Sequence, residues 1–378
     1  MPHQPAISLL KRLQSRAAGE GPEPAAMSLQ VPASNYTEEE RFAQERQRLF
    51  LRRPLVVGHE SQLPEPGDTL VFDWLGLPLI TMRDKAGNIG TFMNVCRHRG
   101  TRLVQEEGTT RLRSLVCPYH QWTYGLDGEL RNVPRSETFD GLDTAQMGLV
   151  ALPCEVRGGL IWIQAEGEMD LDGHLAGLDQ DLEFFDIPGF QFYASNVRTV
   201  DCNWKLIQDA FLDGYHVTRL HKNTVGSFFP DSMAESDQIG DHIRSAVARK
   251  EIFDATGLAA DALDTRRHAT YSYTVFPNAV LVMHPDYTSI ISLFPTSAQQ
   301  TVFAHTMLTP HAPTTAEEQD HFQRSFELID QGVFQAEDIF VSVAAQKGMQ
   351  SGANESLLFG GLEEAAIRFH KIVERELA

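Results

Sequence analysis

Hydrophobic positions fall in short runs bounded by turns over much of the first half of the chain. Between Pro54 and Gln164, apolar runs such as TLVFDW, LPLITMRD and GGLIWIQ alternate with turn-forming pieces such as DKAGN and GLDGEL. Short apolar runs separated by Gly, Asn and Asp are typical of antiparallel strands joined by tight turns. The pattern predicts an all-β domain over residues 54–164.

The following part, residues 165–378, mixes helical and strand periods. Helical spacing covers residues 201–221 and returns over residues 315–347 and 362–376. Between these segments, the runs YSYTVF, AVLVMH, TSIISLF and TVFAHTML stand at hairpin spacing, which predicts a meander of four strands. We therefore expect an α+β domain that combines an antiparallel sheet with long helices.

The N-terminal segment has a different composition. Residues 1–35 are rich in Ala, Pro, Ser and Gln, which predicts a flexible arm. The run NYTEEERFAQERQRLF opens with an Asn/Thr cap and predicts an amphipathic helix over residues 36–53 that packs on the second domain. No run approaches about 18 apolar residues, and the opening lacks the flanks of a secretory signal. We expect a cytoplasmic protein without a membrane span.

Charge and cysteine content narrow the function classes. Among 378 residues, 32 basic and 51 acidic side chains leave a net charge of −19, which argues against binding to nucleic acid or to an anionic membrane. The 4 cysteines are too few for a disulfide framework in a chain of this length. Cys154 and Cys202 have no metal-ligating neighbour in the sequence, so we expect them to be buried packing residues.

The other two cysteines each have a histidine close by. Cys96 stands two residues before His98, and Cys117 stands three residues before His120. Thiolate and imidazole together suit zinc or an iron–sulfur cluster, so ligand type alone leaves the metal open, and a structural zinc site is one interpretation. A C-x-H pair followed by a C-x-x-H pair also lets one iron bind both cysteines and a second iron bind both histidines.

This pair of motifs resembles that of the Rieske family. In this chain it reads CRHRG and, after a spacer, CPYHQWTYGLDGEL, and the similarity spans most of residues 54–164. Gln121 stands where many family members have Gly. Two neutral imidazoles in place of two thiolates raise the reduction potential of a cluster, which suits transfer of single electrons. The resemblance implies a [2Fe–2S] cluster bound by Cys96, His98, Cys117 and His120.

A second set of candidate ligands follows in the helix predicted over residues 201–221. Asp209, Asp213 and His216 stand at i, i+4 and i+7 and would share one helix face. His221 would point elsewhere on a continuous helix, so we expect the helix to end or turn after His216. With that turn, both histidines can bind one ion.

A carboxylate is expected to complete this second site, and Asp338 is the first candidate. Its helical neighbours at i−4, i+3 and i+7 are apolar, namely Phe334, Val341 and Ala345. A carboxylate within an apolar face is costly unless it is paired or binds a metal. Glu337 is the alternative. Two histidines and one carboxylate leave positions open on a six-coordinate ion, as in mononuclear Fe(II) oxygenases.

The run NWKLIQDAFLDGYHVTRLH resembles the catalytic helix of the Rieske non-haem iron oxygenases. The resemblance covers nearly the whole chain except the predicted arm and implies a helix-grip (START/SRPBCC-like) catalytic domain. The implied iron ligands are His216, His221 and Asp338. It also implies that Asp213 accepts hydrogen bonds from His216 and from His120 of a neighbouring subunit, which would orient both rings and give electrons a short route. Asp209 is expected to support this site.

The same resemblance implies partners and a reaction. A catalytic (alpha) subunit of the aromatic-ring-hydroxylating type takes electrons from a separate NAD(P)H-dependent reductase, in some cases through a ferredoxin, and forms a homotrimer. It uses O2 to hydroxylate, dihydroxylate or oxidatively demethylate a small organic substrate, which we expect to be apolar or aromatic. The chain has no G-x-G-x-x-G motif after a predicted strand, as expected if the reductase is another protein.

Residues of the substrate cavity are predicted from their place near the ligand helix or on the sheet. They are Phe211, Val217, Phe228, Val282 and Phe294. His284 and His305, also on the predicted sheet, would be polar groups in the cavity or structural histidines.

Two other function classes fit parts of the sequence. A Rieske electron carrier has the cluster motif but does not need the second set of ligands, and a helix-grip binding protein keeps a cavity without either metal. Iron and sulfide content distinguishes the three classes.

Overall fold

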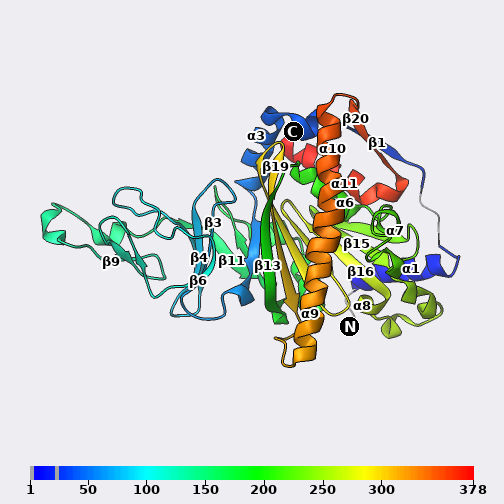
Figure 1. The fold of residues 1–378 in the computed structure, drawn as a ribbon, viewed down its shortest axis with the longest axis horizontal. Helices are drawn as coiled ribbons and strands as arrows, with labels where there is room; N and C mark the ends of the chain where they lie inside the picture. The colour runs from blue at the N-terminus through cyan, green and yellow to red at the C-terminus, as the bar shows by residue number, and fades with distance from the viewer. Residues whose placement is uncertain (1–3, 22–24) are drawn as a thin grey trace. The chain divides into compact units, whose positions relative to one another are not determined.

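The computed structural model describes residues 4–21 and 25–378 (Figure 1). The chain forms two compact units, of which one comprises Met1–Phe50 with Asp170–Ala378 and the other comprises Leu51–Met169. The second unit is therefore an insertion in the sequence of the first. It extends a few residues beyond the predicted domain at both ends.

The unit Leu51–Met169 contains three antiparallel sheets, as the short apolar runs predict. Their strand orders are β10-β5-β4-β3-β6, β11-β12-β2 and β7-β8-β9. The strands are β2 (Leu55–His59), β3 (Asp68–Phe72), β4 (Leu79–Arg83), β5 (Ile89–Met93), β6 (Gly108–Arg111), β7 (Leu115–Val116), β8 (Thr123–Tyr124), β9 (Leu130–Asn132), β10 (Ala151–Leu152), β11 (Cys154–Arg157) and β12 (Leu160–Ile163). One buried cluster of this unit joins Val71 and Ile80 to Trp122, and it includes Cys96 and Cys117.

The other unit is built on a seven-stranded antiparallel sheet of order β13-β19-β18-β17-β16-β15-β14. The four predicted strands are confirmed as β16 (Ala269–Val275), β17 (Ala279–Met283), β18 (Thr288–Ser297) and β19 (Gln300–Thr309). The sheet also contains β13 (Gln191–Val200), β14 (Ala234–Ile239) and β15 (His242–Ala248). The edge strands β13 and β14 are only partly buried, so their sequences lack the apolar runs that mark the central strands.

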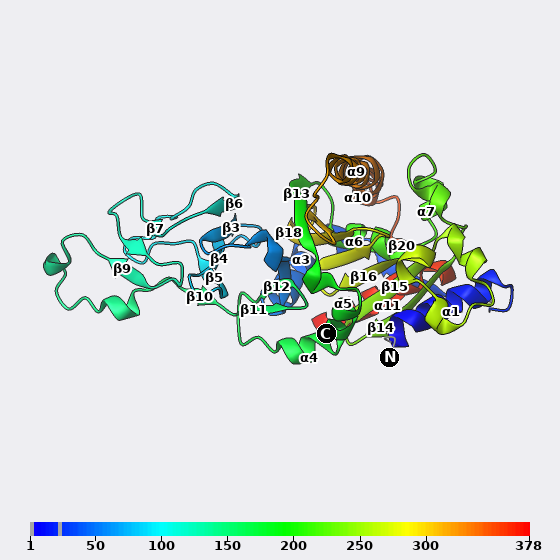
Figure 2. The same cartoon turned by 90° about the horizontal axis from the view of Figure 1, so that it is seen from below.

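Helices accompany this sheet. The segments α9 (Ala316–Glu327), η9 (Leu328–Ile339) and α10 (Phe340–Gln350) form one long helix that runs beside β13 (Figure 1) and is seen end-on in Figure 2. Asn196 of β13 donates a hydrogen bond of 2.8 Å to Asp330 of η9. The remaining helices are α4 (Leu171–Leu175), α5 (Leu178–Phe184), α6 (Trp204–Leu212), α7 (Val217–Leu220), α8 (Thr265–His268) and α11 (Glu364–Leu377).

The predicted N-terminal arm is folded over its described part, which corrects the prediction for residues 1–35. Helix α1 (Gln4–Ala17) buries Leu9 and Leu13, and β1 (Ser28–Pro32) pairs with β20 (Ser356–Gly360). Residues 1–3 and 22–24 lie outside the described residues. The segment is rich in Ala, Pro, Ser and Gln, but the apolar positions of α1 repeat at helical spacing and give this helix a buried face.

The predicted helix over residues 36–53 is divided into α2 (Ser34–Thr37), α3 (Glu39–Glu45) and η1 (Arg46–Phe50). It packs on its own unit through a buried ion pair, in which Lys205 Nζ donates to both carboxylate oxygens of Glu45 at 2.6 and 2.7 Å. Trp204 Nε1 donates to the same carboxylate at 2.8 Å. Within the described part of the chain, no helix is long and apolar enough to cross a membrane.

Candidate metal centres and substrate cavity

The two Cys/His motifs lie on two loops of matching backbone structure. In the first loop, the backbone C=O of Cys96 accepts a hydrogen bond from the N–H of Gly100, and the backbone N–H of Cys96 donates one to the C=O of Thr101. In the second, the backbone C=O of Cys117 accepts from the N–H of Gln121, and its N–H donates to the C=O of Trp122. The fifth residue of each loop has a left-handed backbone, with φ of 76° at Gly100 and 58° at Gln121. Gly adopts this conformation freely, whereas Gln121 adopts it at a cost of about 1 kcal/mol.

The ligand atoms of these loops are brought together in the interior. Cys96 and Cys117 are 2% and 1% exposed, and the rings of His98 and His120 lie 4.6 Å apart between centroids. Burial alone would raise the pKa of the Cys117 thiol, but backbone N–H groups of His120 and Tyr119 lower it below its ordinary value. Both Nδ1 atoms of the two histidines are buried without a hydrogen-bond partner in the described structure. Two thiols and two unpaired ring nitrogens fit a [2Fe–2S] cluster.

Aromatic side chains enclose this site. His98 stacks on Trp122 at 4.9 Å between ring centroids. The Tyr124 hydroxyl lies 3.3 Å from Cys96 Sγ and accepts a hydrogen bond of 3.0 Å from the Arg97 backbone N–H. The phenol can therefore donate its own proton to the sulfur.

The second set of ligands follows α6, and here the structure corrects one prediction. The helix ends at Leu212, and Asp213 has an extended backbone with φ −107° and ψ 111°. Asp209 and Asp213 therefore do not share a helix face with His216. The Asp213 carboxylate accepts a hydrogen bond from the Tyr215 N–H, a local turn that competes with the helix just where the flexible Gly214 follows.

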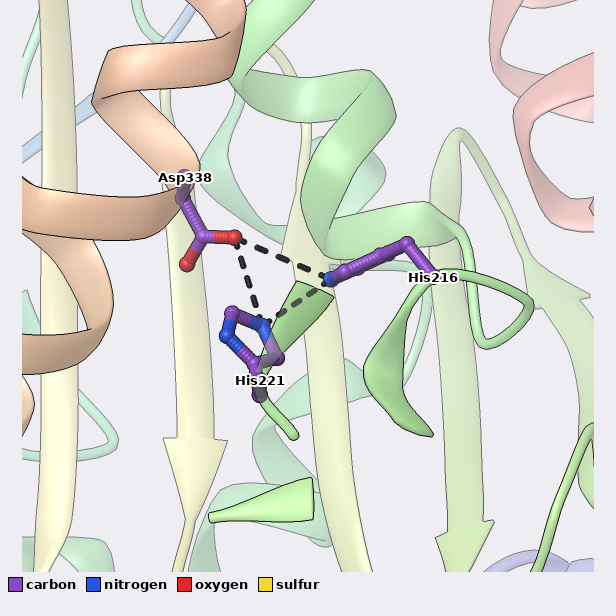
Figure 3. A group of neighbouring side chains, drawn as sticks. All are labelled: His216, His221 and Asp338. Atoms are coloured by element: carbon purple, nitrogen blue, oxygen red, sulfur yellow. Dashed lines mark hydrogen bonds and ion pairs between the residues drawn. The ribbon is translucent and has the colours of Figure 1, made fainter. Parts of the chain in front are cut away.

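The break in the helix allows three side chains to converge (Figure 3). His216 Nε2 and His221 Nε2 are 3.1 Å apart, and Asp338 Oδ1 lies 3.7 and 3.3 Å from them respectively. Ligands bound about 2.1 Å from one ion at angles of about 90–110° are separated by roughly 3.0–3.4 Å. Two of the three separations fall in this range and the third, 3.7 Å from His216 to Asp338, is slightly longer, so the three side chains are grouped closely enough to hold one metal ion.

A carboxylate holds the far nitrogen of each histidine. Asp213 Oδ2 lies 3.3 Å from His216 Nδ1, and Glu337 Oε2 lies 2.7 Å from His221 Nδ1. Thr224 donates a second hydrogen bond of 2.7 Å to Glu337. Burial lowers the pKa of His216, but the hydrogen bond and charge of Asp213 outweigh it, so the pKa is raised overall. Carboxylates in these positions orient the rings with Nε2 toward the ion.

Asp338 itself is 7% exposed, and its Oδ1 has no hydrogen-bond partner among the described residues. Burial raises its pKa to about 6, although the adjacent histidines oppose that rise. The apolar face predicted around it is only partly present, because Phe334 is buried but Ala345 is exposed. Asp338 lies in the π-helical segment η9, whose wider turn shifts the residues that face inward.

Asp209, which was predicted to support this site, contacts two residues distant in sequence. It accepts a hydrogen bond of 2.8 Å from the Tyr36 hydroxyl and lies 2.8 Å from His370 Nε2. These partners come from α2 and α11, so Asp209 connects the helix before the ligand loop to both ends of the chain. Neither partner could be assigned from the sequence, since no motif includes them.

A cavity of about 750 Å³ opens beside the three ligands. Of the five residues predicted to line it, four do: Phe211, Val217, Phe228 and Val282. Phe294 is fully buried and does not line the cavity. Val282 is paired with Ser289, so the odd-numbered positions of β18 share its face of the sheet and Phe294 points to the other face.

The two sheet histidines differ in position. His284 lines the cavity. His305 does not, because its Nδ1 lies 3.0 Å from Asp330 and its Nε2 lies 3.1 Å from Ser289, in a fully buried structural network. The N-terminal segment also contributes to the cavity wall through Met27, which composition did not predict.

Family models match both units. The Rieske [2Fe-2S] domain matches residues 53–150, and the ring hydroxylating alpha subunit (catalytic domain) matches residues 185–378. The chain belongs to the ring-hydroxylating alpha subunit family. Membership implies a Rieske cluster in the unit Leu51–Met169 and a mononuclear Fe(II) ion in the unit that contains residues 185–378. The donor atoms described above fit both groups.

The names of the curated relatives indicate different substrates. The chain is 31% identical over 237 residues to the glycine betaine monooxygenase oxygenase subunit of Pseudomonas aeruginosa, covering 62% of this chain and 53% of the relative. It is 34% identical over 216 residues to the biphenyl 2,3-dioxygenase alpha subunit of Rhodococcus jostii, covering 53% and 45%. The aligned part thus spans about half the length of these relatives.

Solved structures share the fold. A quaternary ammonium Rieske monooxygenase in complex with L-carnitine superposes with a TM-score of 0.80 at 20% identity, covering 97% of this chain and 99% of the other. Naphthalene 1,2-dioxygenase with bound indole gives a TM-score of 0.75 at 19% identity, covering 92% of each chain.

Proposed function

We propose that the protein is the terminal oxygenase component of a Rieske non-haem iron system. The observation that carries the proposal is the convergence of His216, His221 and Asp338 at a large cavity, in a chain that also matches the Rieske [2Fe-2S] domain over residues 53–150. When bound, the cluster supplies single electrons and the Fe(II) ion supplies activation of O2. The product is a hydroxylated, dihydroxylated or oxidatively demethylated small organic molecule.

The protein's own residues have defined tasks in this proposal. Asp213 and Glu337 hold the Nδ1 atoms of the two ligand histidines, which keeps both Nε2 atoms directed at one point. Phe211, Val217 and other apolar side chains place the substrate body beside that point and exclude water.

Partners and assembly extend the proposal. A separate NAD(P)H-dependent reductase, with or without a ferredoxin, delivers the electrons. The subunits form a homotrimer in which Asp213 of one subunit meets His120 of its neighbour. None of the four cysteines forms a disulfide in the described structure, which fits a reducing cytoplasm.

Metal analysis tests the proposal. We expect about three irons and two sulfides per chain. Two irons would support an electron carrier instead, and no iron would support a binding protein.

An Asp213→Ala variant tests the bridging role. It should keep the absorption and EPR spectra of the cluster but lose product formation, since electrons no longer reach the ligand histidine by the short route. Wild-type turnover in this variant would contradict the role of Asp213.

A further inference from the structure

One cation in the cavity wall lacks a close partner. Arg249 follows β15 and lines the cavity. Within the described part of the chain, its side chain makes one ion pair, a long contact of 3.7 Å between Nε and Glu251 Oε2, and no hydrogen bond. A separation of 3.7 Å is too long for a hydrogen bond. The planar fork of N–H donors is therefore available to a ligand.

The guanidinium is held in place by stacking. Its central carbon lies 5.4 Å from the ring centroid of Phe228 and 5.7 Å from that of Phe229. The Arg249 side chain is 14% exposed, so it does not extend into bulk water. A cation fixed over two rings loses little conformational entropy when it binds an anion.

Further unpaired polar atoms occupy the same face of the sheet. Ser245, Ser272 and Val282 are paired across β15, β16 and β17. Thr270 lies two residues before Ser272, and His284 lies two residues after Val282, directly beyond the end of β17. Ser245 Oγ, Thr270 Oγ1 and His284 Nε2 are buried without a partner in the described residues, and all three side chains line the cavity. Burial, with nearby positive charges, lowers the pKa of His284 to about 3, so this imidazole is neutral and can serve as a hydrogen-bonding group.

The acidic residues of the cavity wall, by contrast, are already engaged. Glu235 pairs with Arg12 and Arg16, Asp286 with His321, and Glu364 with Arg368. Asp213 and Asp338 belong to the metal centre. Each of these wall carboxylates therefore has a partner within hydrogen-bond distance in the described structure or belongs to the metal centre, whereas the guanidinium of Arg249 has no partner at that distance.

We infer that the substrate is an organic anion whose carboxylate binds to Arg249. The inference rests on the proposed oxygenase function and names the substrate class for that cavity. The volume of about 750 Å³ lies within the range of about 300–1,000 Å³ that is typical of pockets for drug-sized ligands, so an apolar body larger than choline or glycine betaine fits in it. The carboxylate binds the guanidinium fork, and the apolar body extends along Phe211 and Val217.

Calorimetric titration of the iron-loaded protein tests this inference with three probes that share one apolar body. The probes are phenylbutanoate, phenylbutanol and phenylpropyltrimethylammonium. Phenylbutanoate should bind at least about tenfold more tightly than the other two, and Arg249→Met should weaken it about 10- to 100-fold while leaving phenylbutanol unchanged. Arg267→Met, which removes an exposed arginine outside the cavity wall, is the matched control and should bind phenylbutanoate as the wild type does.

Three results would overturn the inference: tighter binding of the ammonium probe, equal binding of the alcohol, or unchanged phenylbutanoate affinity in Arg249→Met. A carboxylate could bind the iron directly, and then the Arg249 variant would keep its affinity. If Arg249→Met does not fold, Arg249→Gln provides the same comparison. Iron and sulfide content is measured on the same samples, so loss of the metal centres is distinguished from an incorrect substrate class.

Discussion

The hydroxyl of Tyr124 should raise the reduction potential of the cluster, and Tyr124→Phe removes it without changing the ring. The oxygen lies 3.3 Å from Cys96 Sγ and is positioned by the Arg97 backbone N–H at 3.0 Å. Burial and the nearby thiol raise the pKa of Tyr124, so the phenol stays protonated and donates to the sulfur. The donor stabilises the reduced cluster more than the oxidised one, because the reduced cluster is more negative. Removing the Tyr124 hydroxyl should therefore lower the reduction potential of the cluster.

The size of the shift follows from the strength of this hydrogen bond. A hydrogen bond to a charged group contributes about 1.5–3 kcal/mol. If about 1 kcal/mol of that depends on the added electron, and 59 mV corresponds to roughly 1.4 kcal/mol for a one-electron couple, the potential falls by about 40 mV.

Potentiometric titration followed by EPR measures this shift directly. Tyr119→Phe is the matched control, because Tyr119 is 55% exposed and its hydroxyl accepts a hydrogen bond of 3.3 Å from Arg99 instead of contacting a thiol. A Tyr124→Phe potential that equals the wild-type value, or rises, would refute the reasoning.

Four further variants test the structure. Asp338→Asn should abolish mononuclear iron, whereas Glu337→Gln, which replaces the carboxylate beside a ligand imidazole with a neutral amide, should weaken iron binding by about 10- to 100-fold, as measured by iron content after dialysis; equal loss in both would contradict the assignment. Lys205→Met removes one of the two cations that pair with the buried Glu45 carboxylate, the other being Arg41 at 3.1 Å, and should lower the free energy of unfolding in urea by about 3 kcal/mol, and a neutral effect would show that the Lys205 pair is not needed. Gln121→Gly relieves the positive φ and should stabilise the cluster domain by about 1 kcal/mol in thermal unfolding, unless the greater freedom of Gly in the unfolded chain cancels the gain.

Local patterns predicted those parts of the molecule that depend on neighbours in sequence. The four strands β16–β19 and the two Cys/His loops can each be predicted from a pattern of a few neighbouring residues. The convergence of His216 with His221 was also predicted, since residues so close in sequence have few ways to share an ion. Asp338, more than a hundred residues away, was selected because a buried carboxylate needs a partner.

The errors occurred where local hydrogen bonds or tertiary contacts override the regular helix or strand that residue spacing predicts. Asp213 leaves the helix because its carboxylate caps the next turn, and the inward face around Asp338 is changed by a π-helical segment. No partner of Asp209 was predicted, because Tyr36 and His370 are brought to it only by tertiary structure. Phe294 was placed on the wrong face because the register of β18 depends on its pairing with β17.

The chain order of the two units has a consequence for biosynthesis. Leu51–Met169 is continuous and can fold once it has left the ribosome. The iron-binding unit needs both of its segments, and His370 of the last helix contacts Tyr36 and Asp209. Its structure is therefore completed only after the chain through His370 has left the ribosome. The cluster loops are ready for assembly of their cofactor before the cavity and its iron site exist.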